Sequence, residues 1–306
     1  MQLNSRFQPL YKLLFQSLIP QIEDVSENVS GVVLEVGCGN KIFEPWLIKN
    51  VKQYVGLEYP PAVERHSKYS NQYVDVFGDA MEIPFHNDCI DTYISLAVYE
   101  HLKAPHKAIE EAYRILKPGG IIVLILPQSN MTHGIPYDFQ RWTSYGAVAF
   151  LLQHGFRPLK VYRQGSFYIQ LLQRIQGRST IINRLLGNEN ILGRLIQRSL
   201  IALDQNYFAT VSDDPVSIMI VGRKILSNDR LPSWEDIAHV ITKNNEKPRR
   251  VLSRSLLFEL VYFGFLISLT LLYPFLTLWR TFVGKDRRTD LKIVYDEKRD
   301  LQNGNY

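Results

Sequence analysis

The stretch that decides the fold reads Val32-Val33-Leu34-Glu35-Val36-Gly37-Cys38-Gly39-Asn40. An apolar run, rich in β-branched residues, ends at an acidic residue and continues into a Gly-x-Gly turn. Such a run is typical of a buried strand, and the two glycines let the backbone of the following loop approach a ligand closely. The stretch therefore predicts an open α/β sheet that binds a ligand where its first strand ends.

A second acidic residue marks the end of the next apolar stretch. Residues 54–57 lead into Glu58, nineteen residues after Gly39. An acidic side chain at the tip of the second strand is well placed to bind both hydroxyls of a ribose, which predicts a nucleoside-containing cofactor. The nicotinamide fingerprint G-x-G-x-x-G does not fit, because Ile42 stands where its third glycine is expected.

Segments with strand and helix patterns follow one another after Glu58, as in a doubly wound sheet. The predicted strands cover residues 73–77, 91–98, 121–126, 156–162 and 215–222, and the predicted helices cover residues 105–116 and 144–153.

This order resembles the class I S-adenosylmethionine-dependent methyltransferases, in their small-molecule, type 11-like branch. The residues that carry the resemblance are Glu35 to Gly39, Glu58, Asp79-Ala80, Glu100-His101-Leu102 and Leu116-Lys117-Pro118-Gly119-Gly120. The resemblance implies an α/β fold with a Rossmann-like, doubly wound, seven-stranded sheet whose last strand is antiparallel. It also implies S-adenosyl-L-methionine as the cofactor.

The resemblance assigns cofactor contacts to six residues. They are the backbone of Gly37 and Gly39 for the methionine part, Glu35 for its amino group, Glu58 for the ribose diol, and Asp79 and the Ala80 amide for adenine. Lys41 departs from the pattern, because many relatives have a third glycine there.

The segment Thr132 to Thr143 follows the fifth predicted strand and is dense in histidine, aspartate, arginine and aromatic residues. Loops at the carboxyl ends of strands carry function in open α/β sheets, so the segment is expected to form the floor of the acceptor pocket. Similar H-G-x-P-x-D-F-x-R segments occur in methyltransferases associated with bacterial surface polysaccharide biosynthesis.

Methyl transfer from a sulfonium is a direct displacement, which an enzyme promotes mainly by aligning the two partners. A hydroxyl acceptor also needs a base, and histidine is the usual choice near neutral pH. His133 and His101 are the candidate bases, with Asp138 as orienter or alternative base. His101 is equally readable as a structural cap or a cofactor contact, and Arg141 either binds an anionic acceptor group or pairs with Asp138.

Length and composition fit an enzyme domain with additions. The 306 residues, 46% of them hydrophobic, exceed one typical doubly wound domain. We expect this domain over residues 1–226, with a leading helix that lids the cofactor site. A basic helical insertion at about residues 164–206 is expected either to roof the pocket or to lie on an anionic membrane. Cys38 and Cys89 suggest no disulfide and hence a reducing compartment, and the histidines show no metal-ligand spacing, so no metal site is expected.

The carboxyl-terminal part of the chain changes in composition. Residues 227–254 predict a polar linker with an amphipathic piece around 234–241. Residues 255–282 predict a membrane segment, because the twenty residues 260–279 contain no charged side chain. Basic residues flank it on both sides, which leaves single-pass and monotopic topologies open. S-adenosylmethionine is cytosolic, so the catalytic domain is expected to face the cytoplasm, and residues 283–306 form a basic, polar tail.

The expected function is O-methylation of a sugar or other hydroxylated group on a membrane-borne, lipid-linked acceptor, because a tether raises encounter with such a substrate. The alternatives are a methyltransferase of a prenylated quinone or other lipid, and a non-catalytic, cofactor-binding membrane scaffold. The net charge of +5 fits attraction to anionic lipid. No basic–aromatic pattern indicates a nucleic-acid partner, and the oligomeric state is left open.

Overall fold

The structure is a computed structural model of the chain. It describes residues 18–60, 73–165, 170, 215–226, 228–230 and 232–243. Contacts divide the chain between Arg249 and Arg250, and every described residue belongs to the first of the two units.

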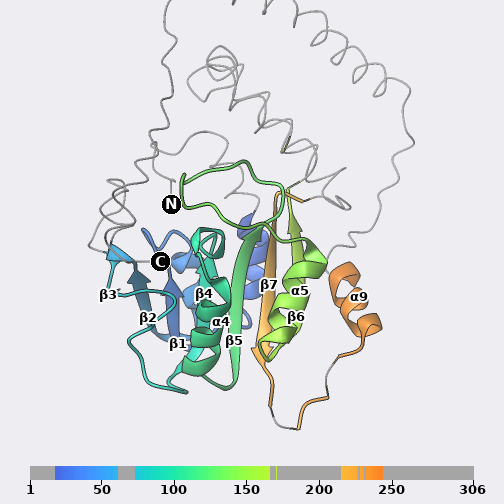
Figure 1. The fold of residues 1–306 in the computed structure, drawn as a ribbon. Helices are drawn as coiled ribbons and strands as arrows, with labels where there is room; N and C mark the ends of the chain where they lie inside the picture. Colours follow the sequence, from blue (N-terminus) through green and yellow to red (C-terminus); the bar gives the residue numbers. More distant parts are fainter. Residues whose placement is uncertain are drawn as a thin grey trace, which may run out of the picture. The chain divides into compact units, whose positions relative to one another are not determined.

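The described part of the first unit is a seven-stranded sheet with helices around it (Figure 1). The elements are β1 (Gly31–Val36), α2 (Glu44–Leu47), η1 (Ile48–Asn50), β2 (Val51–Glu58), β3 (Val76–Phe77), β4 (Ile90–Leu96), η3 (Tyr99–His101), α4 (Pro105–Ile115), β5 (Leu116–Pro127), α5 (Ser144–Gln153), β6 (Phe156–Gln164), β7 (Ser217–Lys224) and α9 (Trp234–Lys243).

The strand order is β3-β2-β1-β4-β5-β7-β6. Strand β7 runs antiparallel to both β5 and β6, whereas the other neighbouring pairs are parallel. The predicted seven-stranded sheet with an antiparallel last strand is therefore confirmed. The order reverses between β1 and β4, which makes the carboxyl ends of these two strands the topological switch point.

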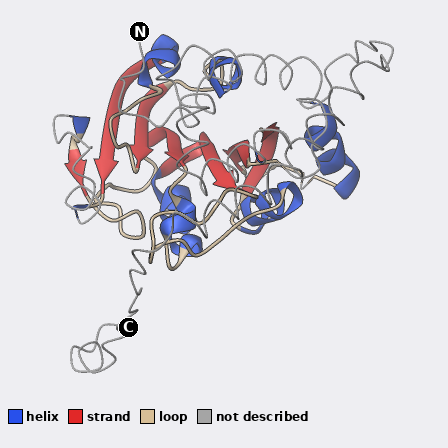
Figure 2. Cartoon of the chain, turned by 90° about the horizontal axis from the view of Figure 1, so that it is seen from above, coloured by secondary structure: helices blue, strands red, loops and turns tan. Residues whose placement is uncertain are grey.

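Both faces of the sheet are covered, as Figure 2 shows from above. Side chains alternate between the faces along each strand. In β5, Ile122 and Leu124 belong to one core cluster while Val123 and Ile125 belong to the other. Because both faces are buried, β1 and the second half of β5 are apolar at almost every position, which explains the continuous apolar runs in the sequence.

Helices α4 and α5 cover the first face. Helix α4 begins with Pro105, whose missing amide proton costs nothing at a first helical position. It buries Ala108, Ile109, Ala112 and Ile115, which recur at helical spacing. The hydroxyl of Thr143 caps α5 by accepting a 3.0 Å hydrogen bond from the Gly146 amide.

Residues 18–25 are helical and cover the second face. Their buried side chains Leu18, Ile22 and Val25 pack in one cluster with residues of β1, β4, β5 and β7. The part of the predicted leading helix before residue 18 lies outside the described residues. Its expected role as a lid stays a prediction.

The predicted end of the domain at residue 226 falls too early. Helix α9 lies within the predicted linker, but its Ile237 and Ile241 are buried in the same core cluster as α5 and β6. The segment appeared polar because only one side of this ten-residue helix is apolar. The folded domain therefore continues to at least residue 243.

Strand boundaries also differ from prediction, most clearly in β3 and β5. Strand β3 covers Val76–Phe77 rather than residues 73–77. Strand β5 begins at Leu116 rather than residue 121, since the turn-like Lys117-Pro118-Gly119-Gly120 is part of the extended chain.

Several predicted segments lie outside the described residues. They are most of the helical insertion at 164–206, the membrane segment at 255–282 and the tail at 283–306. Among the helices of the described ranges, none combines the length and the apolar character that crossing a bilayer requires.

Candidate functional site

The loops after β1 and β4 touch at the switch point of the sheet. The loop after β1 starts with Gly37, which has a φ of 72°, and the loop after β4 starts with Ala97, which has a φ of 58°. A Cβ on Gly37 would lie 2.3 Å from Cγ2 of Val98. Only glycine fits this position, because both the backbone conformation and the close approach exclude a side chain.

Glu58 ends β2 and is tied to the glycine loop. Its Oε2 accepts a 2.9 Å hydrogen bond from the Gly39 amide, and its Oε1 accepts one of 2.9 Å from the Tyr59 amide. The residue is only 5% exposed. Each carboxylate oxygen has a second lone pair, so the oriented carboxylate fits the predicted role of accepting hydrogen bonds from a ribose diol.

Glu35 is buried inside β1 and accepts a 2.9 Å hydrogen bond from the Tyr54 hydroxyl. Burial raises the pKa of Glu35 to about 8, against the opposing effects of Tyr54 and the nearby Lys41. The side chain is therefore mostly protonated at pH 7. The ammonium group of a bound methionine moiety would favour the ionised form of Glu35. The assigned role of Glu35 stays a prediction, and it implies that the affinity for the cofactor depends on pH.

Lys41 departs from the expected glycine pattern. Its side chain connects the loop after β1 to Asp75, the residue before β3. Its φ is 48°, and its Nζ lies 2.5 Å from Oδ2 of Asp75. The same Asp75 oxygen accepts a 2.7 Å hydrogen bond from the Gly56 amide. A Cβ on Gly56 would come within 2.4 Å of Cε of Lys41. The lysine side chain thus passes β2 at Gly56, where there is no side chain in its way. Its ion pair with Asp75 holds the loop after β1 in place.

Asp79 and Ala80 follow β3 at the same edge of the sheet. Oδ1 of Asp79 accepts a 2.8 Å hydrogen bond from the Met81 amide, which is the geometry of an Asx turn. Ala80 is buried. The turn-forming role of Asp79 is thus present, and the predicted adenine contacts of both residues stay predictions.

The cofactor candidates fit S-adenosylmethionine as a set. They lie at or just beyond the carboxyl ends of β1, β2 and β3, which are neighbouring parallel strands. The glycine loop and the oriented carboxylate of Glu58 suit a bound nucleoside with a charged tail. When bound, the cofactor supplies an electrophilic methyl group on a sulfonium sulfur.

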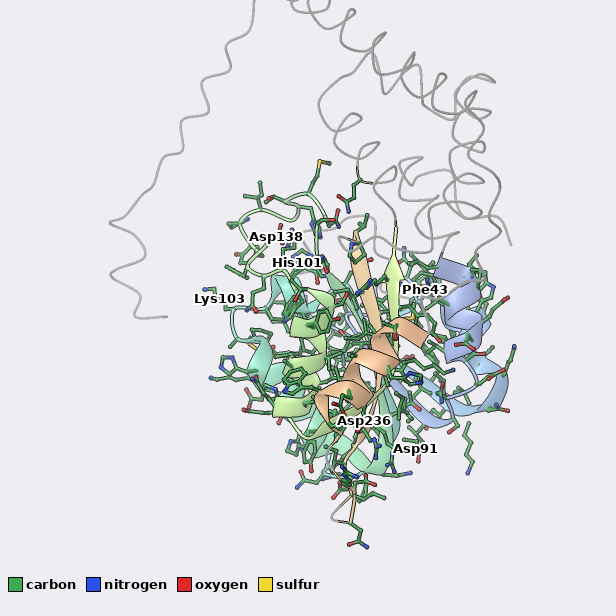
Figure 3. The ribbon with its side chains drawn as sticks, turned by 90° about the vertical axis from the view of Figure 1, so that its right-hand side faces the viewer. Phe43, Asp91, His101, Lys103, Asp138 and Asp236 are labelled. Carbon is green, nitrogen blue, oxygen red and sulfur yellow. The ribbon has the colours of Figure 1, made fainter. Side chains whose placement is uncertain are left out.

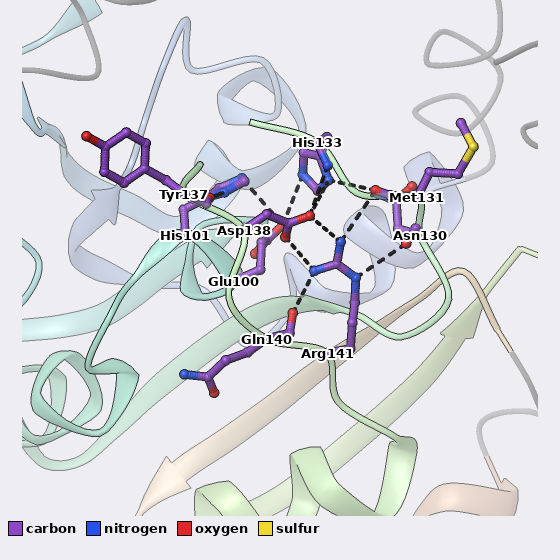
Figure 4. Close-up of polar contacts among 9 residues, drawn as sticks. All are labelled: Glu100, His101, Asn130, Met131, His133, Tyr137, Asp138, Gln140 and Arg141. Atoms are coloured by element: carbon purple, nitrogen blue, oxygen red, sulfur yellow. Dashed lines mark hydrogen bonds and ion pairs between the residues drawn. The ribbon is translucent and has the colours of Figure 1, made fainter. Parts of the chain in front are cut away.

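On the β4 side of the switch point, three side chains converge. Figure 4 shows Glu100, from η3, together with His101 and His133. Nε2 of His133 lies 3.7 Å from Oε1 of Glu100, and Nε2 of His101 lies 3.9 Å from the same oxygen. The two imidazole rings meet edge to face, with centroids 4.8 Å apart. We call these residues the Glu100 cluster.

The structure places both candidate bases together at the carboxyl edge of the sheet. Figure 3 shows His101 and Asp138 at the end of the molecule opposite Asp91, which lies near the start of β4. The side chains of His101 and His133 are 30% and 29% exposed, whereas that of Glu100 is fully buried. The cluster therefore combines two partly exposed histidine side chains with a buried carboxylate.

Backbone carbonyls fix both histidines. Nδ1 of His133 lies 3.0 Å from the Met131 carbonyl oxygen, and Nδ1 of His101 contacts the Tyr137 carbonyl oxygen. A carbonyl only accepts, so Nδ1 carries a proton in each ring and Nε2 of the neutral ring has a lone pair. Glu100 raises the pKa of His133 against the effect of burial.

Asp138 organises the loop around His133. Its carboxylate accepts two hydrogen bonds from Arg141, of 2.5 and 2.7 Å, and one of 2.9 Å from the His133 amide. Arg141 lowers the pKa of Asp138 to about 2. A carboxylate so strongly paired suits positioning rather than proton abstraction. Arg141 was expected either to bind an anionic acceptor group or to pair with Asp138, and the structure shows the pair with Asp138.

The sequence pattern predicts a chemical role for His101 but none for Glu100, the preceding residue of the same motif, which the structure places between the two histidines and the core. The available signal is an acidic residue four positions after the end of β4, in a short turn at the carboxyl edge of the sheet. Such a carboxylate is expected to be buried and therefore in need of a cationic partner.

The comparisons with known proteins agree with this geometry. Residues 34–124 match the family described as "Methyltransferase domain". Over 151 residues the chain is 34% identical to 2-methyl-6-phytyl-1,4-hydroquinone methyltransferase 1, chloroplastic, of Oryza sativa subsp. japonica, covering 46% of each protein. It is 26% identical to an uncharacterized methyltransferase of Mycolicibacterium gilvum, covering 56% of this chain and 72% of that one.

Solved structures give a fainter likeness. An S-adenosylmethionine-dependent methyltransferase from Mesorhizobium loti superposes with a TM-score of 0.42 at 13% identity, covering 68% of this chain and 97% of that one. The chain spans less than half the length of the first curated relatives it matches, at 37%, 46% and 30%. With the strand order and the matched residues together, the chain carries a class I S-adenosylmethionine-dependent methyltransferase domain, whose family implies S-adenosyl-L-methionine as the cofactor.

Proposed function

We propose that the chain transfers the methyl group of S-adenosylmethionine to a hydroxyl of a sugar or other hydroxylated group carried on a membrane lipid. The observation that supports methyl transfer to oxygen most directly is the position of the Glu100 cluster. Glu100 and His101 follow β4, and the start of the same loop touches the Gly37 loop of the predicted cofactor site through Val98. This contact supports a position of the cluster near the predicted methyl donor, where it would receive the proton of an acceptor hydroxyl.

Methyl transfer to a hydroxyl makes two demands on the protein. The acceptor oxygen attacks the methyl carbon in line, the carbon–sulfur bond breaks with its electrons going to sulfur, and the hydroxyl proton must leave. The chain has to align the reactants and provide for the proton. Glu58 and the glycine loop serve the first task, and the Glu100 cluster serves the second. His133 and His101 both stay candidates for direct contact with the acceptor.

The membrane-borne acceptor is supported by the sequence outside the described residues. Residues 260–279 contain no charged side chain and have the length of a bilayer-spanning helix. A catalytic domain held at a membrane meets lipid-linked substrates at a raised effective concentration. We propose that residues 255–282 associate with the membrane, as a single pass or monotopically, and that the domain faces the cytoplasm, where the cofactor is made.

A second candidate acceptor is a prenylated quinone. It is supported by the relatives named 2-methyl-6-phytyl-1,4-hydroquinone methyltransferase, which are 34% identical over 105 to 151 residues. Such an acceptor is also lipid-borne, so a membrane segment would serve both candidates. The two candidates predict different products: the new methyl group is on a sugar or other hydroxylated head group in the first and on the quinone in the second.

The cofactor is tested first, with the full-length chain in detergent. Calorimetric titration with S-adenosylhomocysteine is expected to show micromolar binding, and titration with NADH is expected to show none. Binding of NADH would support an oxidoreductase. Absence of any binding by a folded sample would contradict both the methyltransferase and a cofactor-binding scaffold.

The acceptor is tested with the tritiated methyl donor and membranes from the expressing cells. We expect label in the organic extract that mild acid hydrolysis releases into the aqueous phase, as a sugar would be. Label that stays with the lipid after hydrolysis and co-migrates with a quinone supports the second candidate. Label found only in water-soluble products contradicts a lipid-linked acceptor.

A further inference from the structure

We propose that Glu100, His101 and His133 bind a first-row divalent transition metal of the zinc type, whose open coordination positions take the acceptor hydroxyl. The role given to the metal rests on the proposed methyl transfer. The site itself rests only on the geometry of the three side chains. The spacing of the histidines in the sequence does not predict it.

The first argument is an unpaired buried charge. Glu100 is fully buried, and neither of its carboxylate oxygens has a hydrogen-bond partner among the described residues. The nearest polar atoms are the two imidazole Nε2 atoms, at 3.7 and 3.9 Å, which exceeds hydrogen-bond distance. A carboxylate removed from water in this way is unfavourable unless a cation joins it.

The second argument is the orientation of the two rings. Both histidines donate Nδ1–H to a backbone carbonyl, His133 to Met131 and His101 to Tyr137. Histidines that bind metals are commonly held in this way, because the second hydrogen bond fixes the tautomer and aims the lone pair of the other nitrogen. Here both Nε2 atoms lie near Oε1 of Glu100. When both rings are neutral, three acceptors converge, which is the arrangement that a metal ion satisfies, and such an ion would take the place of the proton that Glu100 favours on His133.

The distances are close to those of an occupied site. The candidate ligand atoms of the three residues all lie within 4.8 Å of one another. Ligands of tetrahedral zinc are about 3.3 Å apart, given metal–ligand bonds of about 2.0 to 2.1 Å. The nitrogen–oxygen separations of 3.7 and 3.9 Å exceed this value by about half an ångström, and the ligand atoms are at most 4.8 Å apart, so metal binding would draw the three side chains closer together.

The donor set indicates the kind of metal. Two imidazoles and one carboxylate suit zinc and the neighbouring first-row ions, whereas magnesium and calcium prefer oxygen ligands alone. Three protein ligands leave at least one coordination position open. Because His101 and His133 are partly exposed and Glu100 is buried, the open side faces away from the core.

A metal here would resolve the need for a base. A divalent ion lowers the pKa of a bound hydroxyl, so its proton can leave to a water molecule near neutral pH. The oxygen lone pair then forms the new bond to the methyl carbon, and both electrons of the broken carbon–sulfur bond go to sulfur. The two histidines act as ligands in this scheme, and Asp138 with Arg141 positions the loop that carries His133.

The test uses the full-length chain in detergent, without a histidine tag, after dialysis against a chelator. Equilibrium dialysis with Zn²⁺ measures stoichiometry and affinity, and the visible absorption of added Co²⁺ reports the ligand field. The variants are His133→Asn and Glu100→Gln. His106→Asn is the matched control, because His106 is an exposed histidine on α4. Titration with S-adenosylhomocysteine on the same samples reports whether the domain is folded.

We expect one Zn²⁺ per chain in the wild type and in the control, and an affinity at least about tenfold weaker in both variants. The Co²⁺ band should disappear in the variants while S-adenosylhomocysteine still binds. A wild type that binds S-adenosylhomocysteine but no zinc, or zinc binding unchanged in His133→Asn, overturns the metal site and leaves the methyltransferase proposal intact. Specific zinc binding without cofactor binding supports the site and contradicts the methyltransferase proposal. The surface variant His133→Asn keeps the test decisive even if Glu100→Gln does not fold.

Discussion

The Gly39 amide donates a 2.9 Å hydrogen bond to Oε2 of Glu58, so the glycine loop after β1 is held by the acidic residue that ends β2. The two cofactor motifs are therefore one structural unit. The carboxylate that we assign to the ribose is oriented before the cofactor arrives, which reduces the ordering that binding requires.

Glu58→Gln is expected to weaken S-adenosylhomocysteine binding about 100-fold. The amide replaces a charged acceptor, and hydrogen bonds to charged groups contribute about 1.5 to 3 kcal/mol each. Calorimetry measures the affinity. Glu82→Gln, an exposed acidic residue on the loop after β3, is the matched control and should bind like the wild type. Equal weakening in both variants would argue against a specific ribose contact.

Gly37→Ala is expected to destabilise the domain and to abolish cofactor binding. The new Cβ would lie 2.3 Å from Val98 at a φ of 72°, and the backbone conformation alone costs about 1 to 2 kcal/mol. Denaturant unfolding measures the loss. Adding Val98→Ala removes the clash but not the backbone cost, so the double variant should recover part of the stability. Recovery of the full wild-type free energy of unfolding in the double variant would mean that the positive φ at residue 37 adds no backbone strain.

The affinity for S-adenosylhomocysteine is expected to rise with pH up to about 8. The pKa of Glu35 is raised from 4.5 to about 8, so below pH 8 the carboxyl must lose a proton before it can pair with the ligand's ammonium group. This linkage corresponds to about a tenfold loss of affinity for each pH unit below 8. Titrations at pH 6, 7 and 8 measure it, and Glu35→Gln should show no such slope. A flat wild-type profile would remove Glu35 from the cofactor contacts.

Ile237→Ala and Ile241→Ala are each expected to lower the free energy of unfolding by about 2 to 4 kcal/mol, because both side chains are buried in the main core. Thr242→Ala, in an exposed position of the same helix, is the control and should cost little. Thermal and denaturant unfolding provide the values. A chain cut after residue 226 should be less stable than the full chain, and equal stability would mean that α9 is dispensable.

Much of the fold could be predicted because its signals are local. The apolar runs of β1 and β5 are long because both faces of the sheet are covered, and Thr143 caps α5 by a bond within one turn. The boundaries that differ have non-local causes. Helix α9 could not be assigned to the core from a pattern that is apolar on only one side.

The grouping of the cofactor candidates could be predicted better than that of the acceptor side. Glu35, Gly37 and Glu58 stand at or near strand ends, which a parallel sheet brings to one edge, and their contacts with the cofactor stay predictions. Lys41 shows the limit of this reasoning, since its side chain reaches Asp75, 34 residues later, through a gap left by Gly56.

The sequence by itself determined the succession of strands along the chain and the acidic residues at their ends, because periodicity and strand ends are encoded by neighbouring residues. The seven-stranded sheet with its antiparallel last strand was expected only from the family resemblance, and the structure supplied the order of strands across it. Only the tertiary structure decided that His133 meets Glu100 and His101. The loop after β5 folds back on η3, where the Phe139 amide donates a 2.7 Å hydrogen bond to the Glu100 carbonyl. Such loop paths depend on contacts between distant parts of the chain, so the chemistry of the acceptor side became visible only when the chain was folded.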